Sequence, residues 1–145
     1  MGILEGKKAL VFGVASNLSI AYGIAKQLKA EGAVVALSYA AVHEKRVKPI
    51  AEELGAAFVE ECDLSNDEAI ESLVNKYEEK FGKIDIIVHS VAFASREALS
   101  GRFMEVTRDD FRVAMDISVY TLIAVVKKFE RIMSDDASVV TLSYY

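Results

Sequence analysis

A run of small residues between two glycines is the segment of this chain best suited to bind an anion. Gly13 opens the run directly after an apolar segment, Ser19 and Ile20 lie near its end, and Gly23 closes it. N–H groups at a helix N-terminus have no intrahelical acceptor and lie at the positive end of the helix dipole, so small residues there let a pyrophosphate approach the backbone. We therefore predict a dinucleotide-binding turn, although its spacing differs from the common Gly-x-Gly-x-x-Gly pattern. The alternative is structural: Gly13 supplies a tight turn, and Gly23 permits close packing of a helix on a strand.

Residues after the second and third predicted strands extend this candidate site, because ligands of open α/β sheets bind beyond the carboxyl ends of the strands. Ala40 stands where an acidic residue usually holds the adenosine ribose. Asp63 could accept a hydrogen bond from the adenine amino group while Leu64 packs against the ring, or Asp63 could only favour the start of the following helix. Charge does not decide between NAD and NADP, because Ala40 is neutral and basic or titratable residues follow it, namely His43, Lys45 and Arg46.

The residues after the fourth predicted strand, 89–94, are mostly small. Such residues let the ribose and nicotinamide of a cofactor lie against the backbone. We predict that His89 is a buried structural histidine and not a general base.

These segments alternate with stretches of helical periodicity, which is the pattern of βαβ units. Apolar runs predict five strands, at 9–12, 33–39, 56–61, 84–90 and 138–143. The fold class is therefore α/β, a doubly wound parallel sheet of Rossmann type, in one domain spanning 1–145.

Four helices are predicted between these strands. The first begins at Ile20 and stops before Gly32, and the second covers 42–54, where Pro49 marks its first turn, a kink or its end. The third covers 65–82, with Ser65 and Glu68 as a capping box. The fourth covers about 108–133 and follows a second capping pattern, formed by Thr107 and Asp110.

Composition and charge exclude several classes of protein. Of the 145 residues, 52% are hydrophobic and 27% are charged, enough for one compact core. The net charge of -5 gives no attraction for nucleic acid or for an anionic membrane surface. One cysteine, Cys62, and two histidines cannot make an internal disulfide or a zinc site. No apolar stretch is long enough to span a membrane and no signal peptide opens the chain, so we expect a cytoplasmic protein without a metal.

Five motifs occur together along the whole chain: Gly13-x5-Ser19-x-Ala21, Cys62-Asp63, His89-Ser90, Met115-Asp116-Ile117-Ser118 and Thr141-Leu142-Ser143-Tyr144. In combination they resemble the bacterial-type enoyl-[acyl-carrier-protein] reductases, a divergent branch of the short-chain dehydrogenase/reductases, from about residue 2 to residue 145. Ordinary short-chain enzymes carry Gly-x3-Gly-x-Gly and Asn-Asn-Ala-Gly, which this chain lacks. The resemblance therefore favours an enoyl reductase over a ketoreductase.

This resemblance implies reduction of the carbon–carbon double bond of a trans-2-enoyl thioester on acyl carrier protein during fatty-acid elongation. NADH is the implied hydride donor, and NADPH is left open. The implied residue roles are Gly13, Ser19 and Ile20 at the pyrophosphate and adjoining ribose, Ala40 at the adenosine ribose, Asp63 and Leu64 at adenine, Val91 at the nicotinamide and Ala94 at the substrate.

Two further expectations come from the same resemblance. Tyr144 matches the first of two tyrosines near the reacting enoyl group, a catalytic position, unless it is only an aromatic residue at the end of a strand. The family also suggests a homotetramer. The helix at about 108–133 is a candidate interface, unless its apolar stripe is covered within the same chain.

Two features of the family are not matched within these 145 residues. The family's catalytic tyrosine and the lysine six residues after it fall beyond the last predicted strand, and five of the seven expected strands are present. That tyrosine stabilises the enolate oxygen electrostatically. We therefore expect a C-terminally incomplete dinucleotide-binding domain without catalytic competence of its own, in which Tyr145 does not replace the tyrosine. A non-catalytic dinucleotide-binding module and a short-chain ketoreductase are the alternatives.

Overall fold

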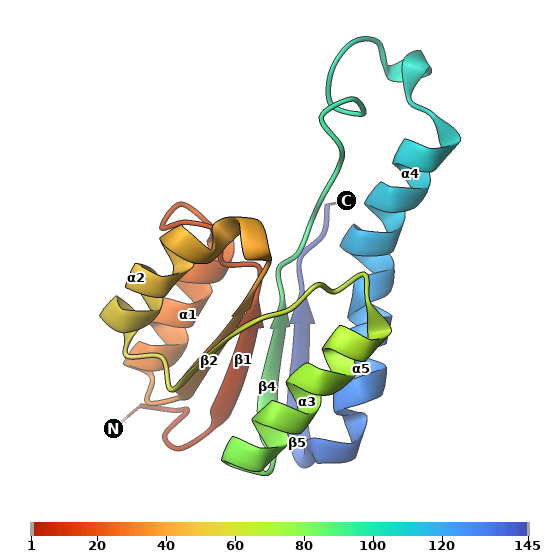
Figure 1. The fold of residues 1–145 in the computed structure, drawn as a ribbon. Coiled ribbons are helices and arrows are strands. Elements are labelled where there is room, and N and C mark those ends of the chain that lie inside the picture. Colours follow the sequence, from red (N-terminus) through yellow and green to blue (C-terminus); the bar gives the residue numbers. More distant parts are fainter. Residues whose placement is uncertain (1, 145) are drawn as a thin grey trace.

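One parallel sheet organises the chain. The computed structural model describes residues 2–144, and its five parallel strands lie in the order β3-β2-β1-β4-β5 (Figure 1). Chain order runs outward from β1 in both directions, so the two halves of the sheet meet between β1 and β4. This confirms the predicted doubly wound α/β fold, and a reversal of this kind is where such sheets bind ligands. The strands are β1 (Lys8–Phe12), β2 (Val34–Tyr39), β3 (Phe58–Glu61), β4 (Ile84–His89) and β5 (Met133–Thr141).

Helices cover both faces of the sheet. On one face lie α1 (Ile20–Ala30) and α2 (Glu44–Leu54), and on the other lie α3 (Asp67–Phe81) and α5 (Thr121–Phe129) (Figure 1). No helix within residues 2–144 is long and apolar enough to cross a membrane.

Each face of the sheet has its own core, because alternate residues of a strand point to opposite faces. Leu10 and Phe12 of β1 pack with residues of α3 and α5, whereas Val11 packs with residues of α1 and α2. The ring of Phe129 packs edge to face on Phe12 and Tyr77, with centroid separations of 6.3 and 5.9 Å. Burial on both faces explains why the strands appear in the sequence as nearly continuous apolar runs.

A helical run connects β4 to β5. It comprises α4 (Arg108–Met115), a π-helical turn η3 (Asp116–Tyr120), α5 and a 3-10 turn η4 (Glu130–Ile132). The predicted helix over about 108–133 is confirmed in extent, although the π turn interrupts its periodicity.

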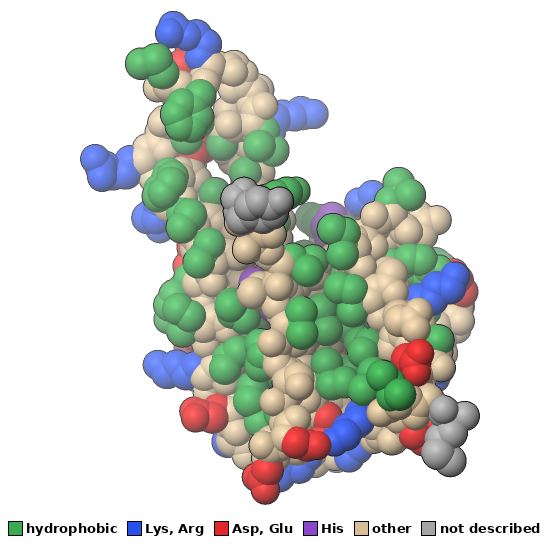
Figure 2. All heavy atoms as spheres, turned by 180° about the vertical axis from the view of Figure 1, so that it is seen from behind, with side chains coloured by type: hydrophobic (Ala, Val, Ile, Leu, Met, Phe, Trp, Pro, Cys, Tyr) green, Lys and Arg blue, Asp and Glu red, His purple; other side chains and the backbone are tan. Residues whose placement is uncertain are grey.

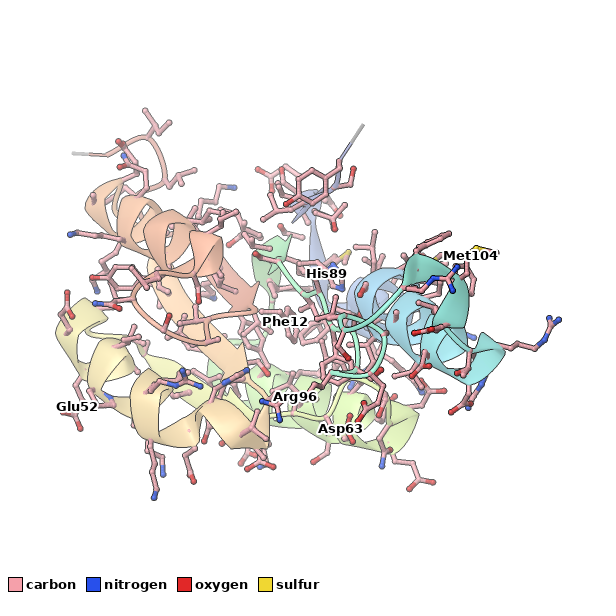
Figure 3. All side chains as sticks on the ribbon, turned by 90° about the horizontal axis from the view of Figure 1, so that it is seen from above. Phe12, Glu52, Asp63, His89, Arg96 and Met104 are labelled. Carbon is pink, nitrogen blue, oxygen red and sulfur yellow. The ribbon has the colours of Figure 1, made fainter. Side chains whose placement is uncertain are left out.

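Residues 90–107 form an arm that rises with α4 beyond the carboxyl ends of the strands (Figure 1). The arm contains a short 3-10 turn, η2 (Phe103–Glu105). Seen from above, Met104 lies at the opposite side of the molecule from Glu52 of α2 (Figure 3). The arm therefore stands over the half of the sheet that carries β4 and β5.

The N-cap of α3 lies one residue after the predicted one. Asn66 caps the helix, since its side-chain oxygen accepts hydrogen bonds from the N–H groups of Glu68 at 2.9 Å and Ala69 at 3.1 Å. Ser65 donates its hydroxyl to Asp63 at 2.6 Å. The predicted capping box of Ser65 and Glu68 is therefore wrong, because the Ser65 hydroxyl is engaged by Asp63.

The boundaries of α2 exclude two of the three predicted roles of Pro49. A 3-10 turn, η1 (Ala41–His43), precedes α2, and the helix continues through the exposed Pro49. It ends at Gly55, whose φ of +59° is left-handed. Pro49 thus neither ends the helix nor lies in its first turn.

Strand β5 begins at Met133, well before the predicted start at 138, and ends at Thr141. Its pairing with β4 passes from Ile84 opposite Met133 to Ile86 opposite Ser138, so residues 134–137 form an irregularity in the ladder. Two aspartates in this stretch have low strand propensity, which explains why the sequence pattern missed it.

The capping of α3 can be tested by a pair of substitutions. Asn66→Ala removes the acceptor for two otherwise unpaired helix N–H groups, and we expect it to lower the free energy of unfolding by about 1 kcal/mol. Ser65→Ala removes an exposed hydroxyl outside the helix, and we expect a change of less than about 0.5 kcal/mol. Urea denaturation followed by circular dichroism measures both. A larger loss for Ser65→Ala than for Asn66→Ala would contradict this assignment.

Candidate functional site

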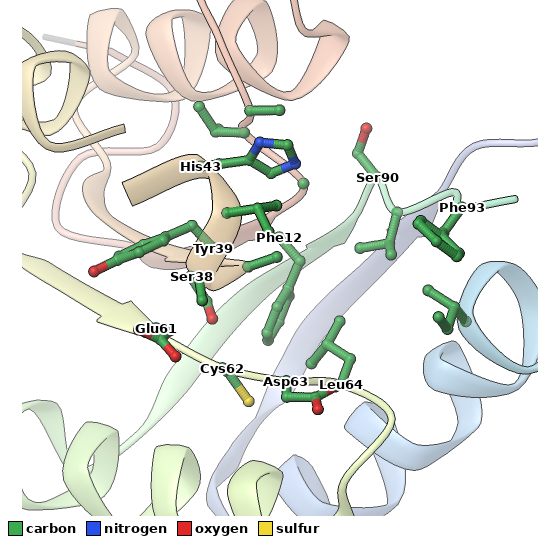
Figure 4. Close-up of a pocket in the computed structure, with 18 of the residues that line it drawn as sticks. Phe12, Ser38, Tyr39, His43, Glu61, Cys62, Asp63, Leu64, Ser90 and Phe93 are labelled. Carbon is green, nitrogen blue, oxygen red and sulfur yellow. The ribbon is translucent and has the colours of Figure 1, made fainter. Parts of the chain in front are cut away.

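A cleft of about 570 Å³ lies at the carboxyl ends of the strands, where the two halves of the sheet meet (Figure 4). The turn after β1 and the loop after β4 form two of its walls. The cleft is lined by residues 12–15, 38–43, 61–65 and 90–93 and by Ile117 of the π turn. Of the predicted site residues, it brings together Gly13, Ala40, Asp63, Leu64 and Val91, whereas Ser19, Ile20, Ala94 and Tyr144 do not line it.

Gly13 is required by the close approach of two backbone segments. Its φ is +107°, a region that side chains disfavour, and a Cβ added there would lie 1.7 Å from the carbonyl oxygen of Ser90. The N–H of Ser90 in turn donates to the carbonyl of Phe12 at 3.1 Å. Gly23 is different, since a Cβ at that position would meet nothing within 4 Å. The alternative role predicted for Gly23, close helix–strand packing, is therefore wrong.

Ser19 organises the turn that Gly13 opens. Its Oγ accepts hydrogen bonds from the N–H groups of Ala15 and Ser16, both at 3.0 Å. These two amides are therefore occupied by the protein itself. The N–H groups of Tyr22 and Gly23 donate to the Ser19 carbonyl at 3.1 and 3.4 Å, so the Ser19 hydroxyl proton and the N–H groups of Ile20 and Ala21 are donors left for an anion at this place. The sequence located this turn but did not indicate that a side chain would fill its centre.

The adenosine end of the cleft lies near β2 and β3. Ala40 is exposed at its wall, and Leu64 is half-buried against the core. The Oδ1 of Asp63 accepts from the N–H of Ser65 at 2.9 Å and from its hydroxyl at 2.6 Å, and within residues 2–144 its Oδ2 makes no hydrogen bond. Burial raises the pKa of the Cys62 thiol to about 11, so this neighbour of Asp63 stays protonated and is a packing residue.

Ser38 is a residue of the cleft that sequence reasoning missed. Its side chain is buried, and its Oγ has no hydrogen-bond partner within the described residues. Figure 4 shows Ser38 at the cleft, on the same side as Phe12. A buried hydroxyl without a partner costs about 1–3 kcal/mol, so a polar group of a ligand in this cleft would satisfy it. The one feature of the sequence that could have indicated a polar group in the cleft is a serine within an otherwise apolar strand.

The other end of the cleft is formed by the root of the arm. Val91 is half-buried and packs against the core, and Phe93 is fixed by Ser118 of the π turn. The Ser118 Oγ accepts from the N–H of Phe93 at 3.0 Å and donates to its carbonyl at 3.1 Å. Ala94 is half-buried next to this contact and lies just outside the cleft.

A second contact holds the arm to α4. The Ser95 hydroxyl donates to Asp110 at 2.7 Å. Hydrogen bonds from Thr107, the larger cause, and from Ser95 lower the pKa of the Asp110 carboxyl. The hydrogen bonds between Asp110 and Thr107 also form the predicted cap of α4. The first residues of the arm are thus attached to the helical run at two places, Ser118 and Asp110.

His89 is a buried structural residue, as predicted. Thr121 donates its hydroxyl to the carbonyl of Ile117 at 2.6 Å, so it must accept from the Nε2–H of His89 at 2.8 Å. The Nδ1 of His89 then accepts from the Thr141 hydroxyl at 3.1 Å. Burial lowers the pKa of His89, which favours this neutral form.

Tyr144 lies beyond the end of β5 and is fully exposed. It does not reach the cleft, so its catalytic role stays a prediction. Tyr145 lies outside the described residues.

A doubly wound parallel sheet with a cleft at its switch point is an α/β architecture of the Rossmann type. The family model described as "Enoyl-(Acyl carrier protein) reductase" matches residues 13–145. The chain belongs to this family.

Relatives of known function agree with the family. The chain is 49% identical over 147 residues to Enoyl-[acyl-carrier-protein] reductase [NADH] FabI of Aquifex aeolicus, covering 100% of this chain and 54% of that protein. It is 44% identical to Enoyl-[acyl-carrier-protein] reductase [NADH] 1 of Rhizobium meliloti, covering 99% and 53%. The chain therefore spans about half the length of the curated relatives it matches.

A solved structure of the same family has the same fold as this chain. The crystal structure of the enoyl-(acyl-carrier-protein) reductase from Anaplasma phagocytophilum in complex with NAD superposes with a TM-score of 0.92 at 39% identity. The match covers 100% of this chain and 56% of that one. The fold described above is thus shared with a relative that binds NAD.

Two glycine substitutions test the packing of the turn. Gly13→Ala places a Cβ on the Ser90 carbonyl and forces an unfavourable φ, so we expect a loss of about 2 kcal/mol or more in the free energy of unfolding. Gly23→Ala adds a methyl group in open space within α1, and we expect a gain of about 0.5–1 kcal/mol. Thermal and urea denaturation measure both changes. Equal effects of the two substitutions would contradict the close approach of Gly13 to Ser90.

Proposed function

We propose that this chain forms the dinucleotide-binding part of an NADH-dependent enoyl-[acyl-carrier-protein] reductase, which reduces the double bond of a trans-2-enoyl thioester carried on acyl carrier protein. The observation that carries the proposal is the cleft at the switch point, with the Gly13 turn as its wall. Membership of the family and the NADH specified in the names of two relatives support it. A carrier-protein thioester is accordingly the proposed substrate.

The cleft suits a dinucleotide on structural grounds. The Gly13 turn lies against the Ser90 carbonyl with no room for a Cβ, so bare backbone forms this wall of the cleft. The buried Ser38 Oγ lacks a hydrogen-bond partner within the described residues, which a polar ligand atom could supply. Residues 13–23 contain no cationic side chain, so the donors that the turn itself offers to a pyrophosphate are N–H and O–H groups. The proposed donors are the Ser19 hydroxyl and the N–H of Ile20.

The remaining residues would orient the cofactor. Asp63 would accept from the adenine amino group through its free Oδ2, with Leu64 against the ring, and Ala40 would lie beside the adenosine ribose. Val91, next to the loop that Ser118 fixes, would contact the nicotinamide end, and bound NADH would supply a hydride there. Ala94 would border the substrate.

Nucleotide binding tests this proposal on the full-length protein that carries this sequence. Ser19→Ala removes a hydroxyl that both orders the turn and donates to the pyrophosphate, so we expect the Kd for NADH to rise about tenfold. Ser100→Ala, in the exposed arm, is the matched control and should leave the Kd unchanged. Titration of NADH fluorescence measures binding, and loss of NADH absorbance with a trans-2-enoyl carrier-protein thioester measures reduction.

The outcomes separate the alternatives. Saturable NADH binding that depends on Ser19, together with enoyl reduction, supports the proposal. Binding without reduction of any enoyl thioester would favour a non-catalytic module. Absence of binding, or binding that Ser19→Ala and Ser100→Ala affect equally, contradicts the proposed site.

We also propose that the protein is a homo-oligomer, a homotetramer by resemblance to its family, and that the helical run from α4 to α5 is its interface. Four apolar side chains at spacings of four residues remain 43 to 62% exposed on this run: Phe111, Met115, Val119 and Ile123. Figure 2 shows hydrophobic side chains along this edge of the molecule. Such a stripe is expected to be covered by another surface.

A cytoplasmic location stays a prediction.

A charge placed within the stripe tests this interface. Ile123→Glu would bury an unpaired carboxylate between subunits, so we expect dissociation to a smaller species. Ile3→Glu makes the same chemical change at an exposed residue near the N-terminus and should leave the assembly unchanged. Sedimentation velocity of the full-length protein measures the mass. An Ile123→Glu variant that keeps the parent mass would contradict the proposal.

A further inference from the structure

One side chain of the π turn holds the first residues of the arm. The Oγ of Ser118 accepts from the N–H of Phe93 at 3.0 Å and donates to the carbonyl of the same residue at 3.1 Å. Within the part of the chain that the structure describes, the backbone of residues 91–94 makes no other hydrogen bond. A single hydroxyl therefore supplies all the hydrogen bonds of this stretch of backbone.

The turn that carries Ser118 is itself anchored to the sheet. Thr121 is fully buried, donates its hydroxyl to the carbonyl of Ile117 at 2.6 Å and accepts from the Nε2–H of His89 at 2.8 Å. His89 is the last residue of β4, and its side chain is buried. The hydroxyl of Ser118 thus extends from a fixed turn to a loop that lacks backbone hydrogen bonds of its own.

This loop forms one end of the cofactor cleft. Val91 and Phe93 line the cleft, and so does Ile117, the residue before Ser118 in the π turn. Figure 4 shows the Phe93 side chain at the edge of the cleft, beside the helical run. In the proposed function, Val91 contacts the nicotinamide end and Ala94 borders the substrate. The residue that Ser118 holds therefore lies in the chain between these two contacts.

We propose that Ser118 is a positioning residue for the enoyl substrate, which acts by holding the peptide groups of Phe93 so that residues 91–94 keep one conformation. The inference rests on the proposed function, because it takes this end of the cleft as the place of the reacting enoyl group. Without the Ser118 hydroxyl, these residues have several conformations available, and the substrate binds only the competent one. The apparent affinity for the substrate then falls by the fraction of protein in that conformation.

Steady-state kinetics of the full-length protein test this role. Ser118→Ala removes both hydrogen bonds, so we expect the KM for a trans-2-enoyl carrier-protein thioester to rise about tenfold, while kcat falls less than about threefold. The Kd for NADH should rise less than about threefold, because the proposed pyrophosphate and adenosine contacts lie at the other end of the cleft.

Two further variants isolate the hydroxyl from the shape of the side chain. Ser118→Thr keeps a hydroxyl at this position and should leave the KM within about threefold of the parent value. Ser118→Val has the shape of threonine without the hydroxyl and should raise the KM as Ser118→Ala does. Equal KM values for the threonine and valine variants would contradict a role of the hydrogen bonds.

Ser95→Ala is the matched control. It also removes a hydroxyl contact between the arm and the helical run, the 2.7 Å bond to Asp110, but Ser95 does not line the cleft. We expect its KM to stay within about twofold of the parent value. Equal effects of Ser95→Ala and Ser118→Ala would show that the attachment of the whole arm is responsible, and would overturn the inference.

Amide hydrogen exchange of the full-length protein without ligands measures the loop independently of the reaction. Within the described residues, the N–H of Phe93 has the Ser118 Oγ as its sole acceptor, so Ser118→Ala should speed its exchange about tenfold or more. The core amides of β1 and β4 should exchange as in the parent protein. That comparison separates a local change in the loop from a loss of overall stability.

The outcomes distinguish this inference from the proposed function. A higher KM with kcat and NADH binding preserved supports the positioning role. A lower kcat with an unchanged KM is the result of losing correctly folded protein, and it would overturn the inference and leave the proposed function intact. A Kd for NADH that rises as much as the KM, or an unchanged exchange rate of the Phe93 amide, would overturn it in the same way. A parent protein that reduces no enoyl thioester would overturn both.

Discussion

The close approach of Gly13 to the carbonyl oxygen of Ser90 is the constraint on which the nucleotide site depends. These two residues belong to the two halves of the doubly wound sheet, and the space between them is smaller than a methyl group. Because no side chain separates the turn after β1 from the loop after β4, the two backbones form adjacent walls of one cleft. The Ser19 hydroxyl then fills the centre of the turn and fixes its amides. The result is a polar surface for an anion that contains no cationic side chain.

The opposite end of the cleft is positioned by neutral hydrogen bonds. His89 joins β4 to the end of β5 through Thr141 and to the helical run through Thr121, all without a net charge. Ser118 fixes the backbone of Phe93 in the same way.

The sequence predicted the parts of this structure that depend on periodicity. Buried strands such as β4 are apolar on both faces, and α3 carries one apolar stripe, so their existence and order follow from the pattern alone. The sequence pattern gave wrong boundaries where local side-chain contacts decide at which residue an element begins. Asp63 engages Ser65 and so moves the cap of α3 to Asn66, and the polar residues before Ser138 conceal the first part of β5.

The candidate site was predictable to a similar degree. Positions just after the strands identified the turn at Gly13 and the cleft residues Ala40, Asp63 and Leu64, because all strand ends of a parallel sheet meet at one edge. The resemblance to the family added Val91. The unpartnered hydroxyl of Ser38 could not be found in this way. It depends on which way a side chain points, and a one-dimensional pattern contains no such information.

Because a π turn joins α4 to α5, the number of residues in this turn sets how α4 is rotated relative to α5. An α-helix advances by about 100° per residue, so a single-residue deletion within Asp116–Tyr120 that restored regular α-helix would swing α4 around the axis by about that angle relative to α5. Ser118 would lose Phe93, and Asp110 would lose Ser95. Natural insertions and deletions should therefore be rarer in these five positions than in the arm, where the chain can absorb a change of length without rotating a helix.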